Sequence, residues 1–237
     1  MNLRENTTSM SNCAHAVVAT VHSPESLALA RRVERCEVDF LELRVDAFAR
    51  DSVALTELER TAPKLRLPLI VTVRHPREGG ASALSARERR ELFMRFLPHA
   101  AIIDVELRAA RELDGVLGKA RAQGVRTVLS HHDFQKTPTL EKLRVLATQA
   151  RAAGADIFKV AALAQTPRDL ATLLAFLTKE KSALAVMAMG ERLGKISRLL
   201  FAQTGSVLNY GFLDRANAPG QWPAKLLKKR IAELTSA

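Results

Sequence analysis

Short apolar segments alternate eight times with segments of helical periodicity along this chain. The apolar segments, many rich in β-branched residues, are 16–21, 40–45, 68–73, 101–105, 126–129, 156–160, 183–187 and 206–210. The helical segments are 26–35, 52–61, 86–96, 107–122, 140–152, 168–177, 195–203 and 223–234. This alternation predicts a parallel sheet covered by helices, and eight strands close a (β/α)8 TIM barrel. An open doubly wound sheet is the alternative, but no glycine-rich dinucleotide loop follows the first strand.

The chain shows no internal boundary, so we predict one barrel domain over residues 16–237 after a flexible N-terminal segment, 1–15. That segment is polar and lacks the apolar stretch of a signal peptide or anchor. No apolar run is long enough to span a bilayer, so no membrane partner is expected. With only Cys13 and Cys36, no disulfide framework is implied. We expect a cytoplasmic protein.

The 36 Lys and Arg residues exceed the 25 Asp and Glu residues, which gives a net charge of +11. The charges are mixed in sign along the predicted helices, as in 87–91 (RERRE), and the chain has one Trp and one Tyr. Nucleic-acid surfaces combine a basic stripe with stacking aromatics, so no nucleic-acid partner is expected. A basic field favours an anionic small molecule instead.

Ionisable residues gather at the carboxyl ends of the predicted strands, where barrels carry their sites. Glu42, Arg44 and Asp46 alternate along the second strand, which puts them on one side of it. Other candidates end later strands or follow them: Arg74, Glu78, Asp104, His131, His132, Lys159, Arg198 and Gln221. Solvation alone does not explain so regular a placement, and we predict a polar site there.

Lys159 lies in an apolar run, 155–161 (ADIFKVA), and we place it at the end of the sixth strand. A lysine in a buried strand costs free energy unless its amine has a partner or a task. A desolvated amine is nucleophilic and can form an imine with a ketone. By its position alone, Lys159 is more often a strand-end lysine whose amine reaches water.

Eight segments together resemble type I 3-dehydroquinate dehydratase, a Schiff-base-forming barrel enzyme of the shikimate pathway. They are 42–46 (ELRVD), 74–80 (RHPREGG), 103–107 (IDVEL), 130–134 (SHHDF), 156–159 (DIFK), 187–190 (MAMG), 196–198 (ISR) and 218–221 (APGQ). They run in the family's order, with nearly its spacing, from the second strand almost to the C-terminus.

The resemblance implies a lyase that dehydrates 3-dehydroquinate to 3-dehydroshikimate through a Lys159 imine. His132 would act as general base and then general acid, and Glu78 would hold its ring and favour the imidazolium. No metal and no cofactor are expected, because the imine is itself the electron sink. The family also suggests a homodimer.

The resemblance assigns further residues to the substrate and its surroundings. Substrate-binding candidates are Glu42, Arg44, Arg74, Arg198, Gln221, Asn217, Met189 and Tyr210, and supporting residues are Asp46, Asp104 and Met187. Arg198 is expected to bind the substrate carboxylate in a bidentate manner, and Gln221 to belong to a loop that closes over the ligand.

The chain departs from the family pattern at three places. Asn217 stands where Ser is usual, Tyr210 where Phe is usual, and the segment 189–198 is one residue longer. These departures affect substrate affinity or loop closure more than the type of reaction. Two other functions fit the same barrel. A class I keto-acid aldolase would also use Lys159, and a binding protein without activity would have no need of the lysine, the histidine and the glutamate together.

Overall fold

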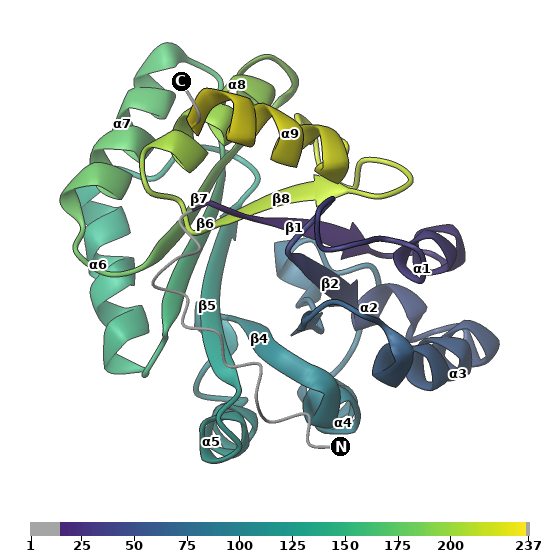
Figure 1. Cartoon of the computed structure of the whole chain (residues 1–237). Helices are drawn as coiled ribbons and strands as arrows, with labels where there is room; N and C mark the ends of the chain where they lie inside the picture. The colour runs from purple at the N-terminus through teal and green to yellow at the C-terminus, as the bar shows by residue number, and fades with distance from the viewer. Residues whose placement is uncertain (1–14, 236–237) are drawn as a thin grey trace.

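The computed structural model describes residues 15–235, and its eight strands form one parallel sheet in the order β7-β6-β5-β4-β3-β2-β1-β8 (Figure 1). The strands are β1 (Ala16–Val21), β2 (Phe40–Arg44), β3 (Leu69–Thr72), β4 (Ala100–Glu106), β5 (Arg126–Asp133), β6 (Ile157–Leu163), β7 (Leu184–Met189) and β8 (Leu208–Phe212). A hydrogen bond from Val207 N to Leu184 O joins the two ends of the sheet, which is therefore a nearly closed barrel. The predicted TIM barrel is confirmed. The expected flexible segment 1–15 lies outside the described residues, apart from His15.

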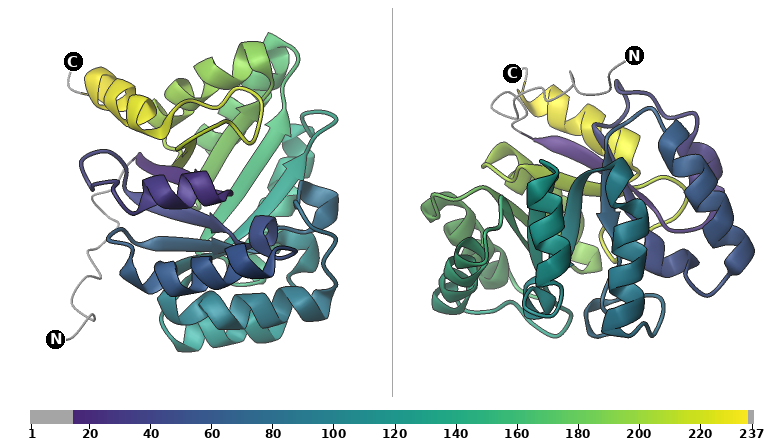
Figure 2. Two further views of the ribbon diagram at one scale, coloured as in Figure 1. Left: turned by 90° about the vertical axis from the view of Figure 1, so that its right-hand side faces the viewer. Right: turned by 90° about the horizontal axis from the view of Figure 1, so that it is seen from below.

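Helices cover the outside of the strands in every view (Figures 1 and 2). They are α1 (Pro24–Ala30), α2 (Val45–Phe48), α3 (Ser52–Thr61), α4 (Ala86–Phe96), α5 (Asp114–Ala122), α6 (Leu140–Ala152), α7 (Pro167–Lys179), α8 (Glu191–Gln203) and α9 (Ala224–Thr235). Several begin at a side-chain cap. Ser85 starts α4 with a capping box, in which its hydroxyl accepts from Glu88 N while the Glu88 carboxylate accepts from Ser85 N.

Several element boundaries differ from those expected. β5 and β6 continue to Asp133 and Leu163, so Lys159 lies inside β6 and not at its end. The helix expected from residue 107 starts at Asp114, because residues 107–109 form only a 3₁₀ turn. Asp46 does not continue β2 but lies in the first turn of α2, so the expected alternation stops at Arg44.

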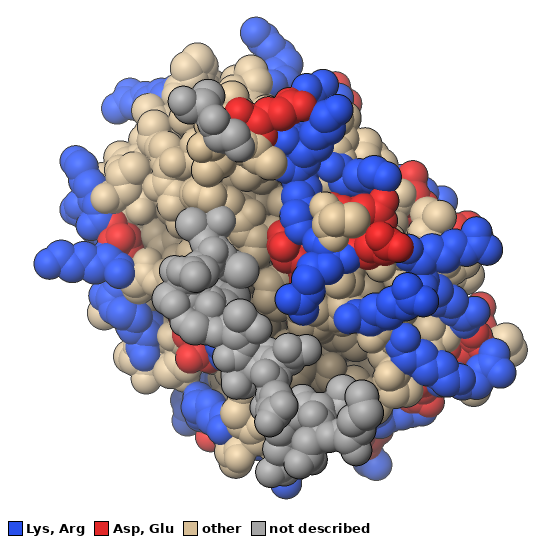
Figure 3. All heavy atoms as spheres, viewed as in Figure 1, with Lys and Arg blue, Asp and Glu red and all other residues tan. Residues whose placement is uncertain are grey.

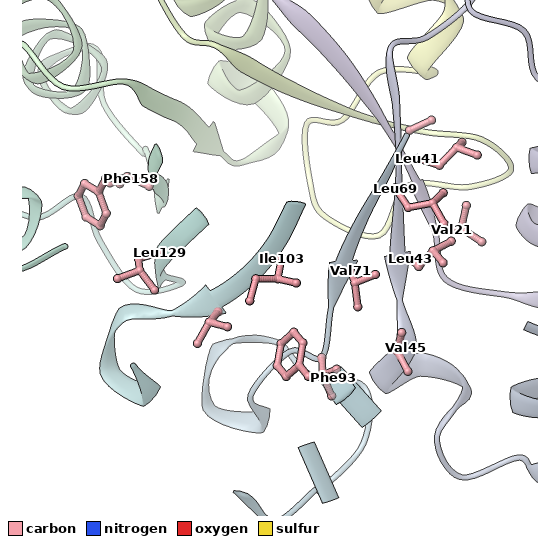
Figure 4. Packing of buried hydrophobic residues seen from close by; sticks show 14 of the residues in the cluster. Val21, Leu41, Leu43, Val45, Leu69, Val71, Phe93, Ile103, Leu129 and Phe158 are labelled. Atoms are coloured by element: carbon pink, nitrogen blue, oxygen red, sulfur yellow. The ribbon is translucent and has the colours of Figure 1, made fainter. Parts of the chain in front are cut away.

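Two apolar layers flank the strands because successive side chains point to opposite faces. The larger layer lies between strands and helices, and Figure 4 shows Phe93 of α4 packed near Val71 and Ile103. The smaller layer fills the barrel interior and includes Met187, Met189 and Tyr210. Each fully buried Val, Leu, Ile, Phe or Met side chain contributes about 1.5–3 kcal/mol to stability. This inner layer adjoins the polar side chains of the site, since Tyr210 contacts Lys159 and Met187 contacts Arg198.

Lys and Arg side chains are spread over the face seen in Figure 3, with Asp and Glu among them, and do not form a single stripe. Among residues 15–235, no helix combines the length and apolarity needed to cross a bilayer.

Candidate active site

Lys159 lies within β6 with its side chain almost fully shielded from solvent. Its Nζ is 2.8 Å from Asp104 Oδ2 and 3.7 Å from Glu42 Oε1. The ammonium also lies 3.8 Å from the centre of the Tyr210 ring, which is a cation–π contact. This lysine does not reach water, and its buried amine is the centre of the site.

Asp104 joins Lys159 to Arg74. The guanidinium of Arg74 donates to both carboxylate oxygens of Asp104, at 3.1 and 2.9 Å. Burial alone would raise the pKa of Asp104, but Arg74 and Lys159 hold it well below its ordinary value. Asp104 is therefore a carboxylate at neutral pH and a partner of the two cations.

Four polar side chains to which the sequence had assigned no role complete this cluster. Arg74 Nη1 also donates to Glu106 Oε1 at 3.0 Å and to Ser130 Oγ at 2.7 Å. Two threonine hydroxyls donate to Glu42, from Thr20 and from Thr72. Alternation on β4 pointed to Glu106, which lies two residues after Asp104, and Ser130 begins the segment 130–134 (SHHDF). Thr20 and Thr72 are short side chains with no sequence signal of their own.

His132 and Glu78 form a pair on the neighbouring strand β5 and the turn after β3. Glu78 Oε2 lies 3.0 Å from His132 Nδ1 and accepts from the backbone N–H of His132 at 3.0 Å. Burial raises the pKa of Glu78 to about 7. Burial, followed by Arg74 and Lys159, lowers the pKa of His132 well below its ordinary value. Desolvation and the two cations outweigh the carboxylate and favour the neutral imidazole, whereas the sequence led us to expect that Glu78 would favour the imidazolium.

His131 lies on the other side of β5. It lines a groove of about 770 Å³ together with Leu117 of α5 and Leu146 of α6, and Glu78 also borders this groove. Adjacent strand residues point to opposite faces, and only the second histidine of the pair belongs to the interior.

Arg198 enters the site from α8 and differs from the other arginines there. Its Nε donates to Gly220 O at 3.1 Å and its Nη1 to Tyr210 O at 2.9 Å, with Met187 Sδ 3.7 Å from Nη1. Burial lowers the pKa of Arg198 to about 10, so it remains charged at neutral pH. No carboxylate of residues 15–235 forms an ion pair with it. A buried cation without an anion is suited to bind one.

The loop that follows β8 is fixed by Gln221. Its side-chain oxygen accepts from the backbone N–H of Asn217 at 2.8 Å and of Ala218 at 3.3 Å. Asn217 itself is exposed. In this arrangement, Gln221 stabilises the loop that carries Gly220 against Arg198.

Arg44 is held by Asp46 through two hydrogen bonds, of 3.0 and 2.8 Å. Asp46 also accepts from the backbone N–H groups of Arg74 and Ala81, which connects β2 with the loop after β3.

Met189 and Tyr210 form part of the inner apolar layer, and the Tyr210 hydroxyl has no hydrogen-bond partner within residues 15–235. No group of three or more His, Cys, Asp or Glu suited to hold a metal occurs in this part of the chain.

The structure is thus a parallel TIM barrel that gathers a buried lysine, a histidine–glutamate pair and, among residues 15–235, an arginine without an ion-pair partner at the carboxyl ends of its strands. The family model described as type I 3-dehydroquinase matches residues 15–235, and the chain belongs to this family.

Curated relatives carry the same description. The chain is 36% identical over 214 residues to the 3-dehydroquinate dehydratase of Methanothermobacter thermautotrophicus, covering 90% of this chain and 92% of the relative. It is 37% identical over 200 residues to that of Latilactobacillus sakei, with 81% of each covered. A solved type I 3-dehydroquinate dehydratase from Clostridium difficile superposes with a TM-score of 0.83 at 26% identity, covering 93% of this chain and 92% of that one. The protein is thus an enzyme of the type I dehydratase family.

Proposed function

We propose that the protein dehydrates 3-dehydroquinate to 3-dehydroshikimate through an imine on Lys159. The observation that carries this proposal is the buried amine of Lys159 beside the His132–Glu78 pair in a barrel of this family. The named substrate comes from the relatives, which are called 3-dehydroquinate dehydratases.

Lys159 forms the covalent bond. The free amine attacks the C3 ketone carbon, the resulting carbinolamine takes up a proton from solvent and loses water, and a protonated imine remains. This cation withdraws electrons from C2 and makes its hydrogens acidic. Asp104 and Glu42 lie within 4 Å of the amine and stabilise the positive imine as they stabilise the ammonium.

His132 transfers the proton. Its Nδ1 is bonded to Glu78, which leaves Nε2 for the substrate. The neutral ring removes a C2 proton to give an enamine and returns it to the C1 hydroxyl, which leaves as water in a syn elimination. Hydrolysis of the imine releases the product and regenerates the lysine.

Arg198 binds the substrate carboxylate, because it is charged and buried and pairs with no carboxylate of the described residues. Glu42, Arg44 and Arg74 bind the hydroxyl groups of the ring. Gln221 and Asn217 close the loop over the ligand, and Met189 and Tyr210 form the apolar side of the site. Asp46, Asp104 and Met187 support these side chains.

We further propose that the reaction needs no metal or cofactor, since the imine provides the electron sink. In the cell we place the protein in the cytoplasm, as a homodimer without nucleic-acid or membrane partners. The mixed charges of the visible surface support the absence of a nucleic-acid partner, and the few cysteines support a reducing compartment. The homodimer rests on the family resemblance alone. The pathway is that of aromatic amino acid biosynthesis.

The test is product formation followed by covalent capture. Purified protein mixed with 3-dehydroquinate should generate the absorbance of a conjugated enone, with or without EDTA. Borohydride added during turnover should inactivate the protein and add the reduced ligand to Lys159 alone. Lys142→Ala, which changes an exposed lysine of α6, should still be trapped, whereas Lys159→Ala should not. A tag on another lysine, or consumption of an aldol substrate instead of 3-dehydroquinate, would contradict the proposal.

A further inference from the structure

Arg89, on α4 outside the barrel, is a fully buried arginine. Its Nε donates to Val73 O at 2.9 Å, its Nη2 forms a short ion pair with Glu106, and its Nη1 has no partner within residues 15–235. Neighbouring Arg87 is exposed and pairs with Glu91 at the helix surface. A buried charge with an unsatisfied donor costs several kcal/mol, and an apolar side chain would fill this place at lower cost. Packing therefore does not explain why an arginine occupies this buried position on α4.

The partner of Arg89 belongs to the active site. Glu106 uses one oxygen for Arg89 and the other for Arg74, and the second oxygen also accepts from His75 N at 2.8 Å. Arg74 continues to Asp104, and Asp104 to Lys159. We call this set the buried ion network: Glu42, Arg74, Arg89, Asp104, Glu106 and Lys159.

The buried ion network contains three cations and three carboxylates, so its charges balance when Lys159 is protonated. Deprotonation of Lys159, which imine formation requires, leaves one net negative charge. Without Arg89 the same step would leave two, and charges in a medium of low dielectric constant repel each other strongly. The other groups that face Lys159 are His132 on β5 and Tyr210 on β8. Arg44 lies beyond Glu42 and is already paired with Asp46. None of these groups supplies the positive charge that Arg89 contributes.

We propose that Arg89 is a positioning residue that controls the reactivity of Lys159 from outside the barrel. By neutralising Glu106, it leaves Arg74 available to Asp104 and limits the excess negative charge around Lys159 when the free amine reacts. The inference rests on the proposed role of Lys159 as the nucleophile. It adds a residue on α4 that does not approach the substrate.

The test measures Lys159 directly and without substrate. Trace acetylation of the intact protein across a pH series, followed by peptide mass spectrometry, gives the pH midpoint at which Lys159 becomes reactive. Arg89→Met leaves excess negative charge and should raise the midpoint by about one pH unit. Glu106→Gln leaves excess positive charge and should lower it. The double variant Arg89→Met/Glu106→Gln restores the balance and should return the midpoint close to that of the wild type.

Arg87→Met, on the exposed side of the same helix, is the matched control and should leave the midpoint unchanged. Midpoint shifts of opposite sign in Arg89→Met and Glu106→Gln support the proposal. Shifts of the same sign in these two variants, or no shift, overturn it. If Arg89→Met does not fold, the same question is decided by two other results: the lower midpoint of Glu106→Gln and the return of the midpoint toward the wild-type value in the double variant. A wild-type protein that fails borohydride trapping would instead reject the proposed function, because acetylation does not depend on the substrate.

Discussion

Glu78 is a carboxyl group that burial has made hard to ionise, and it is bonded to a ring that burial has made hard to protonate. A general acid–base group works best when its proton affinity matches the operating pH. Burial brings the pKa of Glu78 toward neutral pH, whereas it moves the pKa of His132 below its ordinary value and keeps the ring in the neutral form that accepts a proton.

Glu78→Gln should change the dependence of stability on pH. Burial raises the pKa of Glu78 from 4.5 to about 7, so the folded protein binds this proton more tightly than the unfolded chain. The resulting stability is complete below pH 4.5 and is lost as the pH rises through 7. Glutamine does not titrate. Relative to the wild type, the variant should gain up to about 3 kcal/mol between about pH 4 and pH 8, measured by urea unfolding. Glu141→Gln, on exposed α6, should show no such gain.

His132→Ala should separate proton transfer from imine formation. Without the base, turnover should fall by roughly 10²- to 10⁴-fold or more, while borohydride should still attach the ligand to Lys159. His131→Ala should keep most of its activity, because that ring faces the groove beside α5 and α6. Steady-state rates and trapping yields check both. An inactive His131→Ala beside an active His132→Ala would move the base by one residue.

At the scale of elements, the strand–helix alternation could be predicted from the sequence because apolar runs mark strands whose faces are both buried. The ends of the strands were harder to predict. β5 continues through Ser130 and His132, whose polar side chains end the apolar run although each has a buried partner. Arg89 was missed for a related reason: in a helix that reads RERRE, nothing in the sequence distinguishes the one buried arginine from its exposed neighbours.

Gly220→Ala should displace the loop after β8. Gly220 has φ +78°, and a Cβ there would lie 2.5 Å from Gly190 O and 2.7 Å from Gly194 Cα. Because Gly220 O accepts from Arg198, the strain should move that guanidinium and lower kcat/KM by about tenfold or more, as expected for about 1–3 kcal/mol of backbone strain. The matched control is Gly118→Ala in α5, where nothing lies within 4 Å of the new methyl group. This change should leave kcat/KM unaltered and raise stability by about 0.5–1 kcal/mol. Equal activity of the two variants would show that the loop is not fixed at Gly220.

At the scale of the whole molecule, the net charge of +11 acts at long range and does not belong to any one contact. A positive field raises the local concentration of an anionic substrate, and added salt screens it. The value of kcat/KM for 3-dehydroquinate should therefore fall several-fold when NaCl rises from about 10 mM to about 300 mM. Sucrose at matched osmolarity is the control and should have little effect. A rate that is independent of salt would show that only the local cations attract the substrate.

The pairing of β8 with β1 joins segments about as far apart as the chain allows, with Ala16 opposite Leu208. During synthesis on a ribosome at about 5–20 residues per second, β1 therefore lacks its second neighbouring strand, β8, for roughly 10 to 40 s. Its sequence, AVVATV, is fully buried in the finished barrel and is uncharged, as are segments that aggregate when an edge is left open. The last strand to emerge is thus the one that protects the first, and a nascent chain halted before residue 208 should need a chaperone to stay in solution.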